Sequence, residues 1–370
     1  MSDPALTSAM PLSPETRTWR LEEAFTLEAG GCLPSVQLAY RTWGRLAPDG
    51  GNAVLVCHAL TGSADADEWW AGMIGPGRAL DPARDFIVCS NVLGGCYGSS
   101  GPIQPHPGDG APWGSRFPEV SIRDMVRLQA RLLDALGVGR LQLVLGPSLG
   151  GMQVLEWAAA FPERVGAIAP IGVSGRHSAW CIGIGESQRR AIFLDPDWQD
   201  GRYALDRPPR RGLAVARMIA MCSYRSWDNF EARFGRALQD EGDFAVSSYL
   251  NYQGEKLHRR FDANTYVRLT QAMDTHDLAR GRGDYAGVLA AIDMPALVVS
   301  VDSDVLYPPH EQAELARLLP DARYELLSTP AGHDGFLIET GTLGRMVLSF
   351  RGLDASPAAA GQGQRAYFPR

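Results

Sequence analysis

Ser148 stands in a sequence context that could make it a nucleophile. It occupies the third position of Gly-Pro-Ser-Leu-Gly (146–150), after the apolar run LQLVLG (141–146) and before a helix-like segment, GMQVLEWAAAF (151–161). A serine on a sharp turn between strand and helix projects its Oγ at the top of a sheet, the arrangement called a nucleophile elbow. The pattern predicts a nucleophilic serine. The alternative is a tight turn whose serine caps the next helix.

A nucleophilic serine needs a neighbouring base. With a nucleophile elbow, the catalytic groups follow in the chain order serine, acid, histidine. The histidines that follow Ser148 are His177, His258, His276, His310 and His333. The first three fall in a predicted helical insertion, and His310 opens an amphipathic helix, where we expect it to face water. His333 lies in the glycine-flanked loop STPAGHDGF after a strand-like segment, so we predict that it is the base rather than a surface-loop histidine.

The orienting acid and the oxyanion donors follow from the same scheme. The segment ALVVSVDSDVLYPP offers Asp302 and Asp304, and the residues alone do not choose between them. Either carboxylate could hold the imidazole in the required tautomer. We expect the oxyanion donors to be the backbone N–H groups of Leu149 and of Leu60, which follows the strand in AVLVCHALTG (53–62). His58 is then a residue that shapes this loop and not a base.

The elements around these residues predict an α/β fold. Short runs rich in Val, Ile and Leu recur without strict alternation, as in strands buried on both faces of a parallel sheet; they are AVLVCH (53–58), DFIVCS (85–90), LQLVLG (141–146), AIAPIGV (167–173) and ALVVSV (296–301). Helical periodicity marks 121–138, with Ser121 as N-cap and Asp124 in the capping-box position. Alternating strands and helices indicate a mostly parallel sheet covered on both faces.

The chain divides into a core and an insertion. Residues 175–285 show helical patterns and few strand candidates, and the sheet pattern resumes at Met294. We therefore predict a flexible N-terminus over 1–17, a core over 18–174 and 286–352, a helical lid over 175–285 and a loose tail over 353–370.

Composition narrows the class of protein. The 370 residues carry a net charge of −7 and no stripe of Lys or Arg, which disfavours nucleic acid and anionic membranes as partners. The N-terminus has neither the basic nor the apolar region of a secretory signal, and no apolar stretch is long enough to cross a bilayer. Six dispersed cysteines without a CxxC pair indicate free thiols in a reducing cytoplasm, with no metal site.

Longer strings resemble one known family, the homoserine O-acetyltransferases of the α/β-hydrolase superfamily. The resemblance covers roughly residues 18–350. It is carried by AYRTWG (39–44), HALTG (58–62), DEWWAGMIGPG (67–77), NVLGGCYGSSGP (91–102), GGMQVLEWA (150–158), SAWCIGIGESQRRAI (178–192), GLAVARMIAMCSY (212–224), YLNYQGEKLHRRFDANTYVRLTQAMDTHD (249–277), SDVLYPP (303–309) and GHDGFL (332–337).

The resemblance implies an α/β-hydrolase fold with a helical lid and a role for each matching residue. Ser148 matches the family's nucleophile, Asp304 its acid and His333 its base. Arg217 and Asp334 match residues that hold the amino-acid substrate, a zwitterion that requires one cation and one anion. The family implies acetyl transfer from acetyl-CoA, a co-substrate, to homoserine in methionine synthesis. It implies no other cofactor, and a homodimer formed through the lid.

Two departures from the family pattern leave the substrates open. Pro147 and Leu149 flank the nucleophile where relatives often have Gly and Met, and the loop after HALTG is SADADE. Related enzymes use succinyl-CoA or acylate serine, and those that take succinyl tend to have a large or basic residue after the triad aspartate. Val305 occupies that position here, which favours acetyl. The triad is also compatible with a serine esterase of the same fold, and the fold with a non-catalytic binding protein.

Overall fold

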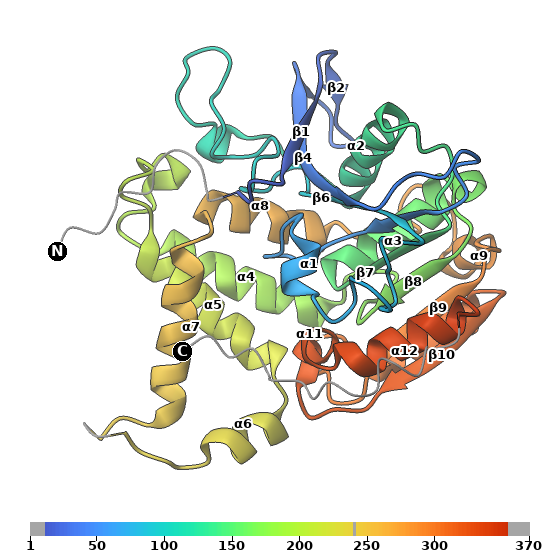
Figure 1. Ribbon diagram of the computed structural model, residues 1–370. Helices are drawn as coiled ribbons and strands as arrows, with labels where there is room; N and C mark the ends of the chain where they lie inside the picture. Colours follow the sequence, from blue (N-terminus) through green and yellow to red (C-terminus); the bar gives the residue numbers. More distant parts are fainter. Residues whose placement is uncertain (1–11, 240–241, 354–370) are drawn as a thin grey trace.

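A twisted sheet of eight strands runs through the molecule (Figure 1). The structure is a computed structural model that describes residues 12–239 and 242–353. The strands lie in the order β1 (Arg17–Leu21), β4 (Val36–Trp43), β6 (Phe86–Ser90), β5 (Ala53–Val56), β7 (Leu143–Pro147), β8 (Ile168–Ile171), β9 (Ala296–Val301) and β10 (Ala322–Leu327). From β6 to β10 neighbouring strands are parallel, as the apolar runs predicted.

Helices cover both faces of this sheet, which confirms the predicted α/β architecture. Alternate residues of β5 face opposite sides: Leu55 belongs to the apolar cluster beneath α2 (Ile122–Ala135) and α3 (Leu149–Ala160). Val54 belongs to the cluster beneath α12 (Thr340–Phe350). The remaining core helices are α1 (Ala66–Trp69), α9 (Tyr285–Ala290), α10 (Pro309–Leu318) and α11 (Gly335–Ile338). The residues of the central strands β5, β7, β8 and β9 are therefore buried from two directions, which explains the unbroken apolar runs.

The start of α2 confirms the predicted capping box. The Ser121 side chain accepts from the Asp124 amide, and the Asp124 carboxylate accepts from the Ser121 amide at 3.0 Å. The same carboxylate also accepts from the Glu28 amide at 2.9 Å, so this cap ties the N-terminal segment to the core.

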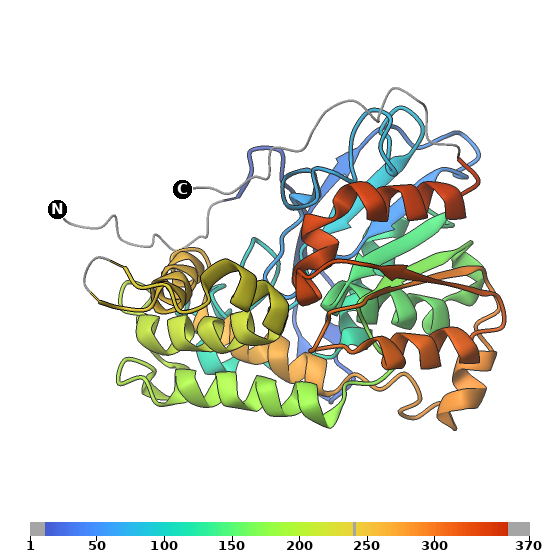
Figure 2. The same cartoon turned by 90° about the horizontal axis from the view of Figure 1, so that it is seen from below.

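The chain between β8 and β9 forms helices gathered on one side of the sheet (Figure 2). Apart from the core helix α9, the α-helices of this stretch are α4 (Ala179–Phe193), α5 (Arg210–Tyr224), α6 (Trp227–Phe234), α7 (Ala245–His258) and α8 (Ala263–Asp274). We refer to these five helices and their connections as the lid. The lid begins after the carboxyl end of the parallel strand β8. It therefore lies over the carboxyl ends of the strands, where Ser148 follows β7. The boundaries at 175 and 285 stay a prediction.

The N-terminal part of the sheet was missed by the sequence analysis. Strands β1 and β4 pair antiparallel, and β4 pairs antiparallel with β6. Strand β1 begins at Arg17, the last residue of the segment that we predicted to be flexible. The rest of that prediction in 1–11, and the tail over 354–370, lie outside the described residues. A short hairpin, β2 (Phe25–Thr26) with β3 (Cys32–Leu33), stands apart from the sheet.

The described helices are all too short or too polar to cross a lipid bilayer.

Candidate active site

Ser148 lies at a strained turn between β7 and α3. Its φ of 56° and ψ of −122° place a non-glycine residue in a sparsely populated backbone region. The Ser148 amide donates to the Ile171 carbonyl of β8 at 2.9 Å, which holds the turn against the sheet. A Cβ on Gly146 would lie 2.4 Å from the Cys57 carbonyl oxygen, and one on Gly150 would lie 2.1 Å from it. Only glycine permits this approach of strand, turn and helix.

His333 and Asp304 form a buried pair. The His333 Nδ1 lies 2.6 Å from Asp304 Oδ2, and the residues are 2% and 3% exposed. The other carboxylate oxygen accepts from the amides of Leu306 and Tyr307 at 2.8 and 2.9 Å. These bonds fix the carboxylate in place with Oδ2 directed at the imidazole. Asp304 accepts a hydrogen bond from the Nδ1–H of His333, which keeps the proton on Nδ1 and leaves Nε2 as the basic nitrogen of the ring.

Asp302 has a different function in the loop. Its carboxylate accepts from the Ser328 hydroxyl at 2.6 Å and from the Thr329 amide at 3.0 Å. These bonds join the end of β9 to the segment that leads from β10 to His333. The geometry thus favours Asp304 over Asp302 as the orienting acid.

The nucleophile and the pair meet at the end of β8. Ser148 bonds to the carbonyl of Ile171, and the next residue, Gly172, lies beside both partners of the pair. A Cβ on Gly172 would be 3.6 Å from the His333 ring and 3.8 Å from Asp304 Oδ2. The His333 Nε2 is buried and has no hydrogen-bond partner among the described residues. It is the free group expected of a base whose bond to the nucleophile tightens when substrate binds.

The other histidines that follow Ser148 lie in places that do not suit a catalytic base. Burial lowers the pKa of His177 to about 3 and that of His276 to about 4. His177 contacts the Tyr307 hydroxyl at 3.2 Å, and His276 contacts the Ser174 carbonyl at 3.2 Å. His310 is exposed on α10, as predicted. His258 closes α7 in the lid.

His58 holds the loop that contains Leu60. Its Nε2 accepts from the Val92 amide at 3.2 Å, so Nδ1 carries the proton and donates to the Ala59 carbonyl at 2.8 Å. Burial lowers the pKa of His58 to about 4, which keeps the ring neutral. Leu60 itself is buried. The amide of Leu149 is the first of α3, where N–H groups have no partner within the helix.

Arg41 explains the acidic sequence of the loop SADADE (63–68), which departs from the family pattern. The guanidinium of Arg41, on β4, binds Asp67 through two bonds of 2.5 and 2.9 Å and Asp65 through one of 2.9 Å. Arg41 is only 7% exposed, so these carboxylates balance a buried charge. The loop is therefore anchored to the sheet directly after the oxyanion segment.

The two predicted substrate-binding residues both lie near Tyr224. Arg217 stacks over the Tyr224 ring at 5.3 Å, and that ring lies 5.7 Å from the His333 ring. Burial raises the pKa of Tyr224, Arg217 lowers it and Asp334 raises it, as expected for a hydroxyl near both charges. Asp334 forms its ion pair with Arg225 at 3.2 Å.

Arg225 is a site residue that the sequence analysis missed. Its Nε is buried without a hydrogen-bond partner among the described residues, although its Nη2 binds Asp334. The loop before His333 runs against its backbone: a Cβ on Gly332 would be 2.8 Å from the Arg225 carbonyl carbon. The signal in the sequence was its place one residue beyond the string GLAVARMIAMCSY.

A pocket opens beside His333 beneath the lid. Its lining includes Leu60 and the two tyrosines, Tyr224 and Tyr307, whose rings lie 5.7 and 5.2 Å from the His333 ring. Its roof comes from α4 and α8 and includes Ile184, Gln188, Thr270 and Met273. A wider groove beyond His177 is lined by α10 and Tyr285 and does not contain the triad residues. The triad residues themselves line neither cavity, but the smaller pocket is bounded by Leu60 and by the two tyrosines whose rings lie against His333.

Comparison with known proteins defines the class first. A family model described as alpha/beta hydrolase fold matches residues 52–340. A homoserine O-acetyltransferase of Trichormus variabilis is 59% identical over 341 residues, which cover 92% of this chain and 95% of that protein. The chain belongs to the homoserine O-acetyltransferase family of the α/β hydrolases.

Solved structures share the fold closely. Esterase E22 superposes with a TM-score of 0.85 at 26% identity and covers 91% of this chain and 99% of its own. The homoserine O-acetyltransferase from Bacillus anthracis also has a TM-score of 0.85, at 24% identity, and covers 92% of this chain and 98% of its own. These structures share the fold of this chain, and a fold alone does not determine the activity, so the activity has to be argued from the site.

We predict that Asp304→Asn lowers the reactivity of Ser148 by about 10⁴-fold, because the amide favours the wrong imidazole tautomer. The rate of Ser148 labelling by a fluorophosphonate measures this reactivity. Asp302→Asn is the matched control and should lower the rate much less. The reverse ranking would show that Asp302 is the orienting acid.

Proposed function

We propose that this chain transfers the acetyl group of acetyl-CoA to the hydroxyl of L-homoserine, through an acyl-enzyme on Ser148. The observation that carries the proposal is the placement of Arg217 and of the Asp334–Arg225 pair around Tyr224, next to the buried His333–Asp304 pair. An esterase of apolar substrates has no use for such charges. A zwitterionic acceptor needs them.

The first half of the reaction would form the acyl-enzyme. His333 Nε2 takes the proton of Ser148 Oγ, and the oxygen attacks the thioester carbonyl of acetyl-CoA. The amides of Leu60 and Leu149 bind the resulting oxyanion. The C–S bond then breaks, and the departing CoA thiolate receives the proton from His333. Asp304 stabilises the imidazolium between these steps.

The second half would repeat these steps with homoserine in place of CoA. Its carboxylate binds Arg217 and its ammonium binds Asp334. His333 takes the proton of the substrate hydroxyl, and the oxygen attacks the acetyl carbonyl on Ser148. Collapse releases O-acetylhomoserine and returns the proton to Ser148. Water is the competing acceptor, and the burial of Ser148 at 6% exposure and of His333 at 2% limits its access.

Turnover with paired donors and acceptors tests this function. We expect acetyl-CoA to exceed succinyl-CoA by about tenfold in kcat/KM, because Val305 offers no cation to a second carboxylate, although at 44% exposure it leaves that carboxylate partly solvated. Serine, one methylene shorter than homoserine, should react about 10²-fold more slowly, since its hydroxyl falls short of the acyl carbon. Thiol release gives the rates, and a rapid quench with acetyl-CoA alone should show one acetyl on the Ser148 peptide.

Ser148→Ala is the control and should lose on the order of 10⁴-fold in rate. Comparable rates with succinyl-CoA or a preference for serine would change the substrate and leave the nucleophile unaffected. Thiol release that does not depend on any amino acid would instead indicate an esterase or a thioesterase.

The role of Arg217 can be isolated because it would touch only the second substrate. Arg217→Met should raise the KM for homoserine about ten- to hundredfold, as expected for a lost charged hydrogen bond. The rate at which acetyl-CoA alone acylates Ser148 should stay within about twofold. Arg211→Met, at an exposed position of the same helix, is the matched control. An acylation rate that falls with the homoserine affinity would contradict this role.

We also propose a cytoplasmic homodimer that associates through the lid. Large apolar side chains exposed on the lid helices support it, among them Leu194 at 82%, Trp227 at 73% and Trp180 at 57%. The six cysteines are free thiols, which suits a reducing compartment. Light scattering should give twice the mass of the chain, and Trp227→Glu should shift it toward the monomer. A monomer at micromolar concentration would contradict the dimer.

A further inference from the structure

Two peptide groups connect a lid arginine to the predicted oxyanion donor. Arg260 follows α7, and its Nη1 donates to the Thr61 carbonyl at 2.8 Å. The N–H of that same peptide group belongs to Gly62, and it donates to the Ala59 carbonyl at 2.8 Å. The N–H of the Ala59 peptide group belongs to Leu60. The connection therefore runs from a guanidinium, through two peptides, to the amide that would bind the oxyanion.

Peptide geometry gives this connection a direction. The N–H and C=O of a trans peptide point in opposite directions within one rigid plane. Fixing the Ala59 carbonyl with the donors from Gly62 and His58 therefore fixes the direction of the Leu60 N–H. Fixing the Thr61 carbonyl with Arg260 fixes the Gly62 N–H in the same way.

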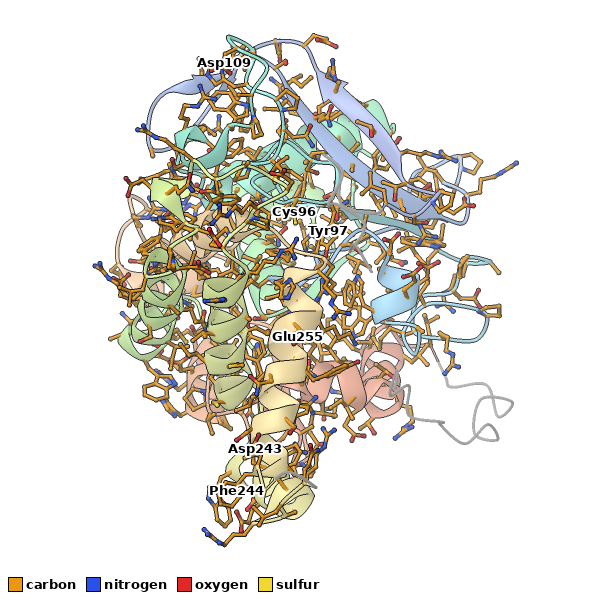
Figure 3. The ribbon with its side chains drawn as sticks, turned by 90° about the vertical axis from the view of Figure 1, so that its left-hand side faces the viewer. Cys96, Tyr97, Asp109, Asp243, Phe244 and Glu255 are labelled. Carbon is orange, nitrogen blue, oxygen red and sulfur yellow. The ribbon has the colours of Figure 1, made fainter. Side chains whose placement is uncertain are left out.

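Arg260 is itself held rigidly by Tyr97. The Tyr97 hydroxyl accepts from Arg260 Nη1 at 2.8 Å and donates to the Arg260 carbonyl at 2.7 Å. Tyr97 is 8% exposed, and its ring packs edge-on against Phe261 at 5.9 Å. Burial raises the pKa of Tyr97 to about 12, so the hydroxyl keeps the proton that it donates. Figure 3 shows Tyr97 beside one end of α7, the helix on which Glu255 is labelled.

We propose that Arg260 is a positioning residue for the oxyanion hole, and that it couples the lid to the chemistry at Ser148. The inference rests on the proposed role of Leu60. A charged donor forms a stronger hydrogen bond than a neutral one, and linked hydrogen bonds polarise one another. The guanidinium therefore orients the Leu60 N–H and makes it a better donor to negative charge.

Replacing Arg260 by Gln tests the connection. Loss of one direct oxyanion donor costs about 10²- to 10³-fold in kcat. An effect transmitted through two peptides should be smaller, so Arg260→Gln should lower kcat for acetyl transfer about tenfold. The KM for homoserine should stay within about twofold. The Kd of a methyl trifluoromethyl ketone, which adds to the serine as an oxyanion, should rise by the same factor as kcat falls.

Arg259→Gln is the matched control, because Arg259 is 72% exposed in its side chain and pairs only loosely with Glu255 at 3.5 Å. It should leave kcat, KM and the ketone Kd unchanged. Tyr97→Phe keeps the ring and removes both bonds to Arg260, so it should produce a smaller loss of the same kind. The double variant should lose less than the product of the two single losses.

The outcomes separate this inference from the proposed function. If Arg260→Gln matches Arg259→Gln in kcat and ketone Kd, the connection is wrong and acetyl transfer stands. If KM rises and the melting temperature falls while the ketone Kd stays constant, Arg260 only supports the lid, and the proposal is again wrong. If the parent protein transfers no acetyl group, the proposed function fails, and the ketone Kd still tests the connection at Ser148.

Discussion

The close approach of two glycines to the Cys57 carbonyl is the constraint on which the site depends. It allows α3 to start directly at the end of β7, and the turn between them leaves Ser148 with a positive φ. That strain is acceptable because the hydrogen bond from the Ser148 amide to β8 and the burial of the turn hold it in place. The same contact brings Cys57, and therefore the following segment 58–62, next to the nucleophile. One backbone contact thus brings both proposed oxyanion amides to one place.

Three buried charges described above are each paired. Asp304 has His333 and two backbone amides, Asp334 has Arg225, and Arg41 has two aspartates. Breaking such a pair costs more than the pair itself contributes, because it leaves one charge buried alone. If Asp334 binds the substrate ammonium as proposed, its pair with Arg225 changes the charge that the ammonium meets. The carboxylate is shared with a fixed cation, so the ammonium adds to an existing pair and does not meet a free anion.

The parts of the molecule that the sequence predicted are those determined locally. The turn at Ser148, the N-cap of α2 and the apolar parallel strands depend on neighbouring residues and long buried runs. Asp302 and Asp304 could not be separated from the residues alone, because both follow β9 and only the Leu306 and Tyr307 amides distinguish them. Strand β1 was missed because its sequence, RTWRL, has no apolar run at the sheet edge.

The remaining misses depend on contacts between distant segments. Arg225 acquires its role from a loop about a hundred residues later, which places Asp334 beside it. Arg260 meets Thr61 across 199 residues of sequence. Neither residue has a local pattern that sets it apart from other arginines of the chain. The resemblance to a family supplied Arg217 and Asp334, and it was limited to the residues that the matching strings contained.

The hydrogen bond between Arg260 and Thr61 limits how the lid of this fold can be replaced. A helical insertion between two strands looks like an exchangeable module, a part that recombination or design could replace to change the substrate. Here the insertion also supplies the donor that completes the backbone of a loop in the other module. A graft that kept the core intact and brought a lid without this arginine would leave the Thr61 carbonyl without its charged donor. Lid and core are separate parts of the fold in this chain, but because of this contact they would have to be exchanged together.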